Sequence, residues 1–123
     1  MKITPEFTNF LAQDRAEELD INALVDYAYD LRKKNPRGKE ISNYGGWHSN
    51  NLNHSDAKLK PLFNAIQTRL DYLHDYLGFS GQKKQQLGNI WINIPPWLPH
   101  YVTASKTDEE RISIAFNTDI VPK

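Results

Sequence analysis

A cation and a hydroxyl stand two residues apart near the C-terminal end of the sequence, at Arg111 and Ser113. Side chains two residues apart in a β-strand point to the same face of a sheet, so both would line one surface if this segment is extended. A guanidinium binds a carboxylate through two parallel hydrogen bonds, and a neighbouring hydroxyl can add another. The pair is therefore a candidate anchor for an acid group, although an exposed strand with a surface arginine is the commoner source of such a pattern.

A single imidazole, His100, precedes this pair and follows the apolar stretch Trp97-Leu98-Pro99. Histidine is a common metal ligand, but an isolated one is more often a hydrogen-bonded structural residue. Together the three side chains form the pattern histidine, ten residues, arginine, one residue, serine. This spacing is the starting point for a functional hypothesis.

Two amphipathic helices are expected upstream of these residues. Apolar positions with helical spacing predict the first helix over residues 21–34, with Asp20 as its N-cap and Asn35-Pro36 as its end. A second apolar stripe predicts a helix over residues 58–77, followed by Gly78 at the position that favours glycine. Both helices have one apolar face, so we expect them to pack against a sheet.

The segment between the two predicted helices, from Pro36 to His54, has no hydrophobic period. It is rich in glycine, asparagine and serine, which is typical of a loop. Loops of this length are usually functional or disordered. Because Tyr44 and Trp47 lie within it, we expect an ordered loop packed against the domain.

Strands are expected in the C-terminal third of the chain. Isoleucines alternate with Asn89, Trp91 and Asn93 before Pro95-Pro96 ends the pattern. Two further strands are predicted over residues 99–104 and 111–117, and a fourth is conceivable near residues 2–7. The fold is therefore expected to be α+β, in a single domain over residues 1–123 with a helical part to about residue 80 and a β part over about 88–123.

Composition excludes several classes of protein. The chain has 123 residues, equal numbers of acidic and basic side chains and a pI of about 6.9, so it lacks the basic charge typical of a nucleic-acid-binding protein. The absence of cysteine excludes disulfides, a thiolate nucleophile and cysteine-ligated metals. No signal peptide and no membrane-spanning stretch are evident, so we expect no membrane partner and a cytoplasmic location.

Four segments in this order resemble a known family, the 2-oxoglutarate/Fe(II)-dependent oxygenases, and within it the small oxygenases of phages and marine bacteria. The H-x10-R-x-S spacing resembles the C-terminal signature of that family. The four similar segments are Ser42-Asn43-Tyr44-Gly45-Gly46-Trp47, Trp91-Ile92-Asn93, Trp97 to Val102 and Arg111 to Asn117, and the last two contain the residues of this pattern. They cover residues 40–120 in patches, and their combination is more specific than any one of them.

The resemblance implies a jelly roll, also called a double-stranded β-helix, with the two amphipathic helices packed outside. It implies Fe(II) held by two histidines and one carboxylate, the facial triad of such enzymes. His100 would be the distal iron ligand, Arg111 with Ser113 would bind the far carboxylate of the co-substrate 2-oxoglutarate, and Asn93 is a weaker candidate for a polar contact to it. The reaction implied is oxidative attack on a C–H bond of a substrate that the sequence does not identify.

The sequence departs from the family pattern in one respect. The family needs an H-x-D or H-x-E motif between the W-x-N strand and the distal histidine, but Asn93 and His100 are separated by six residues that include no His, Asp or Glu. Three or four strands also cannot close an eight-stranded jelly roll. We therefore expect a partial jelly roll, with the middle of the barrel missing at the junction of Ile94 and Pro95.

His54 and Asp56 form the one H-x-D triplet in the chain, and with His100 they could hold iron. The commoner role of Ser55 or Asp56 at this position is to cap the second helix. His48 has no partner cluster nearby in the sequence, so a zinc site is not expected. His74, together with the carboxylates of the second helix, is expected on the solvent side of that helix.

Two functions follow from these observations. The first is a 2-oxoglutarate- and Fe(II)-dependent dioxygenase of unknown substrate. The second is a non-catalytic binding module that keeps part of the fold and uses an exposed apolar sheet edge to recruit a partner or form a homodimer.

Overall fold

The computed structural model describes residues 1, 11–39, 46–78, 81–95 and 111–123 of the chain. This part is an α+β fold. Its elements in chain order are α1 (Ile21–Lys34), β1 (Trp47–His48), the 3-10 turn η1 (Ala57–Leu59), α2 (Lys60–Tyr76), β2 (Lys83–Ile94) and β3 (Ser113–Pro122). The α+β prediction is confirmed, whereas the jelly roll stays a prediction.

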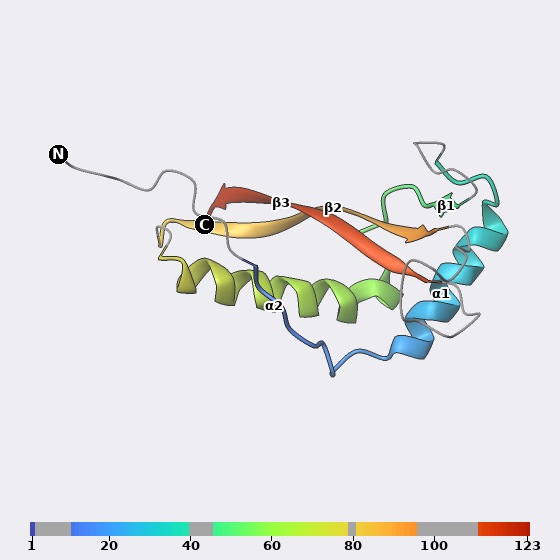
Figure 1. The fold of residues 1–123 in the computed structure, drawn as a ribbon, viewed down its shortest axis with the longest axis horizontal. Coiled ribbons are helices and arrows are strands. Elements are labelled where there is room, and N and C mark those ends of the chain that lie inside the picture. The colour runs from blue at the N-terminus through green and yellow to red at the C-terminus, as the bar shows by residue number, and fades with distance from the viewer. Residues whose placement is uncertain (2–10, 40–45, 79–80, 96–110) are drawn as a thin grey trace.

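The strands form one antiparallel sheet in the order β1-β2-β3. The long β2–β3 ribbon lies over α2, which runs along it, while α1 lies near β1 at one end of the molecule (Figure 1). The sheet therefore has one face toward α2, and we call the opposite face the open face. The arrangement is compatible with part of a larger β structure.

The core forms where β2 meets the helices. Ile90, Ile92 and Ile94 are at most 2% exposed, as the alternating pattern of the sequence predicts for a strand covered on one face. They pack with Leu59 and Leu62 in a cluster that also includes Ala28 of α1. Burial of an aliphatic side chain stabilises the fold by roughly 1.5–3 kcal/mol, so this row is the main apolar contribution of the strand.

The sequence predicts the helices closely. α1 has the predicted bounds, and the Asp20 side chain accepts a hydrogen bond of 3.1 Å from the Ala23 N–H. The second helical segment begins with η1, because Asp56 caps that turn by accepting from the Lys58 N–H at 3.0 Å. Gly78 follows α2 with a φ of 71°, the left-handed conformation that favours glycine.

The strands are longer than the alternating pattern indicates. β2 begins at Lys83, and its polar first half pairs with the second half of β3, up to Pro122. A register shift between Leu87 and Ile90 interrupts the alternation, so a period of two could not reveal the whole strand. Arg111 lies two residues before β3, which begins at Ser113. The predicted strands at residues 2–7 and 99–104 lie outside the described residues.

The loop after β1 continues along the outer edge of β2. The Ser49 and Leu52 N–H groups donate to the Ile92 and Ile90 carbonyls at 2.9 and 2.8 Å. The Ser49 hydroxyl, which is buried, accepts from the Ile92 N–H at 2.9 Å and donates to the Asn50 carbonyl at 2.7 Å. The prediction of an ordered loop is therefore confirmed for its described part from residue 46 onward.

Trp47 holds β1 against the end of α1. Its ring is 5% exposed, and the indole N–H donates to the Asn35 carbonyl at 2.8 Å. The Lys39 N–H donates to the His48 carbonyl at 2.7 Å. Gly38 has a φ of 58° and lies so close to Trp47 and the His48 carbonyl that no side chain fits there. These contacts set the orientation of β1.

The prediction for His74 is wrong. His74 is buried, at 4% exposure, because it lies one turn after the buried Leu70 on the inner side of α2. Asp71 and Asp75 are exposed, as expected. The inner stripe of α2 is therefore wider than its apolar residues indicate.

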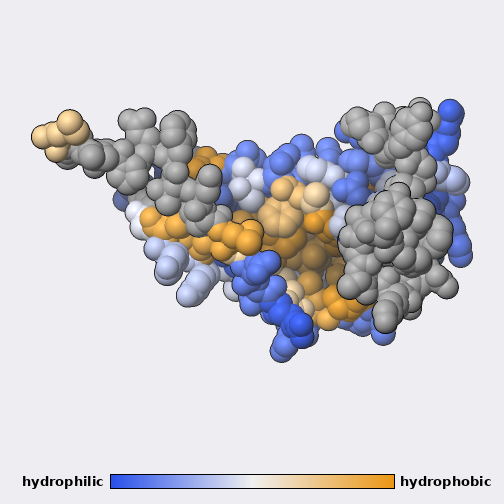
Figure 2. Space-filling model, viewed as in Figure 1, coloured by the Kyte–Doolittle hydropathy of each residue, from blue (hydrophilic) through white to orange (hydrophobic). Residues whose placement is uncertain are grey.

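Part of the helix-side surface of β3 is uncovered in the described structure. Phe116 and Ile120 are 39% and 54% exposed. Hydrophobic surface gathers across the middle of the face seen in Figure 2.

None of the helices in the described part is both long and apolar enough to cross a membrane.

The buried Ser49 hydroxyl allows a test of how firmly the loop is attached. Ser49→Ala leaves the Ile92 N–H without this acceptor, and we expect a loss of about 1–3 kcal/mol in the free energy of unfolding. Urea titration followed by circular dichroism measures the change. Ser55→Ala, at an exposed position, is the control and should change stability by less than about 0.5 kcal/mol. Equal stability of the two variants would show that the hydroxyl is not needed.

The hydrogen bond between the Tyr27 hydroxyl and Asp56, 2.8 Å long, allows a test by pH. Burial first, and then Asp56, raise the pKa of Tyr27 to about 12. The unfolded chain loses this proton near pH 10, so the contribution to stability is complete below about pH 10 and is lost as the pH rises through about 12. The wild type should therefore lose unfolding free energy between about pH 10 and about pH 12. We expect Tyr27→Phe to lose less over this range, as measured by urea titration.

At low pH, the effect of the same contact on stability depends on Asp56, and its pH dependence has the opposite sign. The Tyr27 hydroxyl, followed by the Lys58 N–H, lowers the pKa of the Asp56 carboxyl. The contribution of the Asp56 carboxylate to the free energy of unfolding is therefore present above the usual pKa of an aspartate. It is lost as the pH falls through the lowered pKa of Asp56. Tyr72→Phe, at an exposed site on α2, should keep the wild-type profile at both ends. A Tyr27→Phe profile as steep as that of the wild type would contradict the assignment.

Candidate functional site

Three polar side chains form a row across the open face of the sheet. His48 of β1 pairs with Asn93 of β2, and Asn93 pairs with Ser113 of β3. Their neighbours Trp47, Ile92 and Ile94 are buried on the side of the helices, so alternation directs this row to the opposite face. Directly opposed residues of antiparallel strands have Cβ atoms about 5 Å apart. Two predicted site residues, Asn93 and Ser113, are therefore brought together.

Arg111 lies at the end of this row. It is exposed and stands two residues before Ser113, a spacing that keeps both residues on one side of an extended chain. Asp119, the acidic residue of β3, is six residues beyond Ser113, or roughly 20 Å along the strand. An anion at Ser113 would thus lie close to a cation and far from that carboxylate. His100 lies outside the described residues, so its role stays a prediction.

His48 is a site residue that the sequence pattern does not reveal. Its Nδ1 lies 2.6 Å from the Ser49 carbonyl oxygen. Because a carbonyl can only accept, Nδ1 carries the hydrogen, and the lone pair of the neutral ring is on Nε2. The ring also stacks on Trp91, with centroids 5.8 Å apart and an angle of 11° between the planes. The sequence feature that could have indicated this role is the position of His48 directly after Trp47. When one residue of a strand is buried, the next points to the opposite face of the sheet.

The alternative iron ligands His54 and Asp56 have structural roles. His54 Nε2 donates to the Gly88 carbonyl at 2.8 Å, and its ring stacks on Phe63 with centroids 5.0 Å apart. Asp56 accepts from the Tyr27 hydroxyl and caps η1. Asp56 thus caps the 3-10 turn that opens the second helical segment, whereas α2 itself has Leu59 at its N-cap without a side-chain hydrogen bond. Both side chains are engaged in joining α1, η1 and the β2 bulge.

The described residues do not assemble a facial triad. Within them, no three His, Cys, Asp or Glu side chains converge as a metal site would require. The row on the open face contains one imidazole, one amide and one hydroxyl, which suits hydrogen bonding to a ligand better than tight binding of iron. The described part of the chain therefore does not supply a full set of iron ligands.

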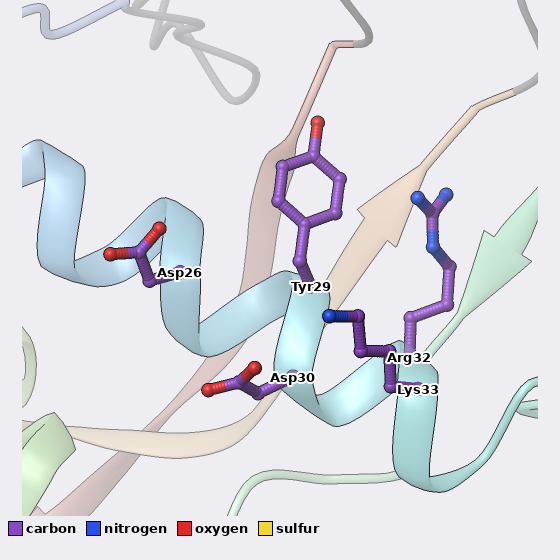
Figure 3. A pocket seen from close by; sticks show the side chains of 5 residues that line it. All are labelled: Asp26, Tyr29, Asp30, Arg32 and Lys33. Carbon is purple, nitrogen blue, oxygen red and sulfur yellow. The ribbon is translucent and has the colours of Figure 1, made fainter.

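The hollow on α1 shown in Figure 3 is a different kind of surface. It is lined by Asp26, Tyr29, Asp30, Arg32 and Lys33. These side chains all come from one helix and spread along it without converging. The Arg32 guanidinium lies 5.0 Å from the centre of the Tyr29 ring, a cation–π contact within the helix. No predicted site residue lines this hollow.

Comparison with known proteins leaves the family open. No family model matches the chain, and no curated protein or solved structure shows significant similarity to it.

Proposed function

We propose that the protein is a 2-oxoglutarate- and Fe(II)-dependent dioxygenase of the hydroxylase type. The observation that carries the proposal is the pairing of Asn93 with Ser113 on the open face. Two of the three residues proposed to contact the co-substrate are thus direct neighbours on different strands, and Arg111 precedes Ser113 by two residues. The sequence spacing alone required neither their proximity nor their common face.

The chemistry of this group suits a carboxylate. A guanidinium provides a planar fork for two parallel hydrogen bonds, while the Ser113 hydroxyl and the Asn93 amide provide further donors. The helices cover the other face of β2, so the ligand would bind where a barrel has its interior. In this proposal His100 would be one ligand of the iron, and bound Fe(II) would supply the oxygen chemistry that oxidises the substrate.

The carboxylate site is tested with 2-oxoglutarate by isothermal titration calorimetry. We expect Arg111→Ala to weaken binding roughly tenfold to a hundredfold, because a hydrogen bond to a charged group contributes about 1.5–3 kcal/mol. Ser113→Ala should weaken it by about twofold to tenfold. Arg111→Lys keeps the charge and loses the planar fork, so its affinity should fall between those of the wild type and Arg111→Ala.

Lys83→Ala is the matched control, since it removes a cation at the far end of β2. It should bind 2-oxoglutarate as the wild type does. Equal affinity of wild type and Arg111→Ala would overturn the carboxylate site. The catalytic part is tested by anaerobic titration with Fe(II) and by formation of succinate from 2-oxoglutarate in air. Absence of both iron binding and succinate would overturn the assignment as a dioxygenase.

A non-catalytic binding module is the second candidate. The observation that favours it is the exposure of Phe116 and Ile120 on β3, together with the lack of a converging metal-ligand group in the described residues. Large apolar side chains exposed near a sheet edge are typical of an interaction surface. A second copy of the chain fits this edge, because antiparallel pairing of two β3 strands about Asn117 would place Ile114 opposite Ile120.

Sedimentation equilibrium separates the module from a monomeric enzyme. If β3 forms a dimer interface, the wild type should sediment as a dimer, and Ile120→Lys should shift it toward the monomer by burying a charge at the contact. Tyr76→Lys, at an exposed aromatic residue of α2, should leave the dimer intact. A monomeric wild type at high micromolar concentration would rule out this use of β3.

A further inference from the structure

A groove lies between α1 and the start of the second helical segment. One wall is formed by α1 and the two residues before it, and the other by η1 and the first turn of α2. Its volume is about 360 Å³, near the lower end of the range for ligand pockets, roughly 300–1,000 Å³. A space of this size suits a single side chain or another small group.

Much of the lining of the groove is apolar. Leu62 of α2 is 5% exposed, and Leu19 and Leu24 on the other wall are half-buried. All three also pack in the hydrophobic core, so their positions are fixed by the fold. Ala23 and Pro61 add exposed apolar surface to the two walls. An aliphatic chain bound here would therefore exchange contact with water for contact with these side chains.

The charged residues of the groove are mostly acidic. Three aspartates and one lysine line it: Asp20, Asp26, Asp30 and Lys58. Asp20 is engaged as the N-cap of α1. The lysine is close to a carboxylate outside the groove, since hydrogen bonds from the Tyr27 hydroxyl and the Lys58 N–H lower the pKa of Asp56 and the Lys58 charge lowers it further. The two aspartates that remain are thus the main charges available to a ligand.

Asp26 and Asp30 are exposed, and neither makes a hydrogen bond or an ion pair with another described residue. They are four residues apart on α1, so their Cβ atoms lie about 5–6 Å from each other, and like charges at this spacing destabilise a helix. Figure 3 shows their carboxyl groups pointing the same way from successive turns, away from the Arg32 guanidinium. A cation between the two carboxylates would relieve their repulsion.

We propose that this groove binds an arginine side chain of a partner peptide. The aliphatic stem of the arginine lies against the apolar lining, and its guanidinium faces the carboxylates of Asp26 and Asp30. A guanidinium presents five N–H donors in one plane and can contact two carboxylates at once, whereas a lysine ammonium is a compact point charge. The groove is lined by helical elements and not by the sheet, so the inference does not rest on the proposed function.

NMR titration of the full chain with Nα-acetyl-arginine amide tests the groove. Nα-acetyl-citrulline amide is the matched probe, since its side chain has nearly the same shape and no charge. We expect the arginine probe to bind about twofold to tenfold more tightly, as two exposed ion pairs allow. It should shift the backbone signals of Ala23, Asp26 and Asp30 in the proton–nitrogen spectrum. Nα-acetyl-lysine amide should bind more weakly than the arginine probe.

Two double variants separate the groove from general attraction to acidic helices. Asp26→Asn with Asp30→Asn keeps the shape of both side chains, and it should reduce the affinity for the arginine probe to that for the citrulline probe. The control is Asp71→Asn with Asp75→Asn, which removes two exposed carboxylates of the same spacing from α2. It should bind the arginine probe as the wild type does. All four positions are exposed, so both variants should keep the spectrum of the folded chain.

Several results would overturn the proposal. Equal affinities for the arginine and citrulline probes, or equal losses in the two double variants, would show that the groove is not an arginine site. Shifts centred on Asp71 of α2 would have the same meaning, and equal affinity for the lysine probe would refute the choice of arginine. Changes in the same α1 signals when the protein alone is concentrated would show that a second copy occupies the groove in place of a partner peptide. The outcome with 2-oxoglutarate affects none of these results.

Discussion

The hydrogen bonds along both edges of β2 are the constraint on which the rest of the described structure depends. β3 pairs with one edge, while β1 and the loop that follows it satisfy the other. Unpaired backbone groups beside a buried isoleucine row would be costly, because each buried polar group needs a partner. The Ser49 hydroxyl serves as one of these partners where the loop leaves regular pairing. The Ser49 side chain thus provides the acceptor for the Ile92 N–H that the backbone of the loop does not provide.

Pairing along β2 also determines which side chains lie on the open face of the sheet. Burial of Ile92 and Ile94 against the helices turns Trp91 and Asn93 to the open face, and the register carries the same division to β1 and β3. His48 is directed outward because Trp47 is held inward by its bond to the Asn35 carbonyl. A one-residue slip of β1 would exchange the two rings between the faces. The packing of one indole under the sheet therefore determines the position of an imidazole above it.

The parts of the fold that were predictable are those with a local physical cause. The bounds of α1 follow from an apolar stripe and a capping aspartate, and the inward row of β2 follows from strict alternation. The first half of β2 was not predictable in this way, since its polar residues pair with β3 across a bulge and need no apolar period. His74 was misplaced for a related reason: burial on α2 follows the geometry of the helix and not the polarity of the residue.

The candidate site shows the same division between local and long-range causes. Arg111 and Ser113 are close in sequence, so their common face could be expected from strand periodicity. The proximity of His48, Asn93 and Ser113 depends on strand pairing between residues 45 and 20 positions apart, which composition and spacing do not encode. The stack of His48 on Trp91 likewise depends on the register of β1. The sequence identifies the chemical groups, and strand register decides which of them can act on one ligand.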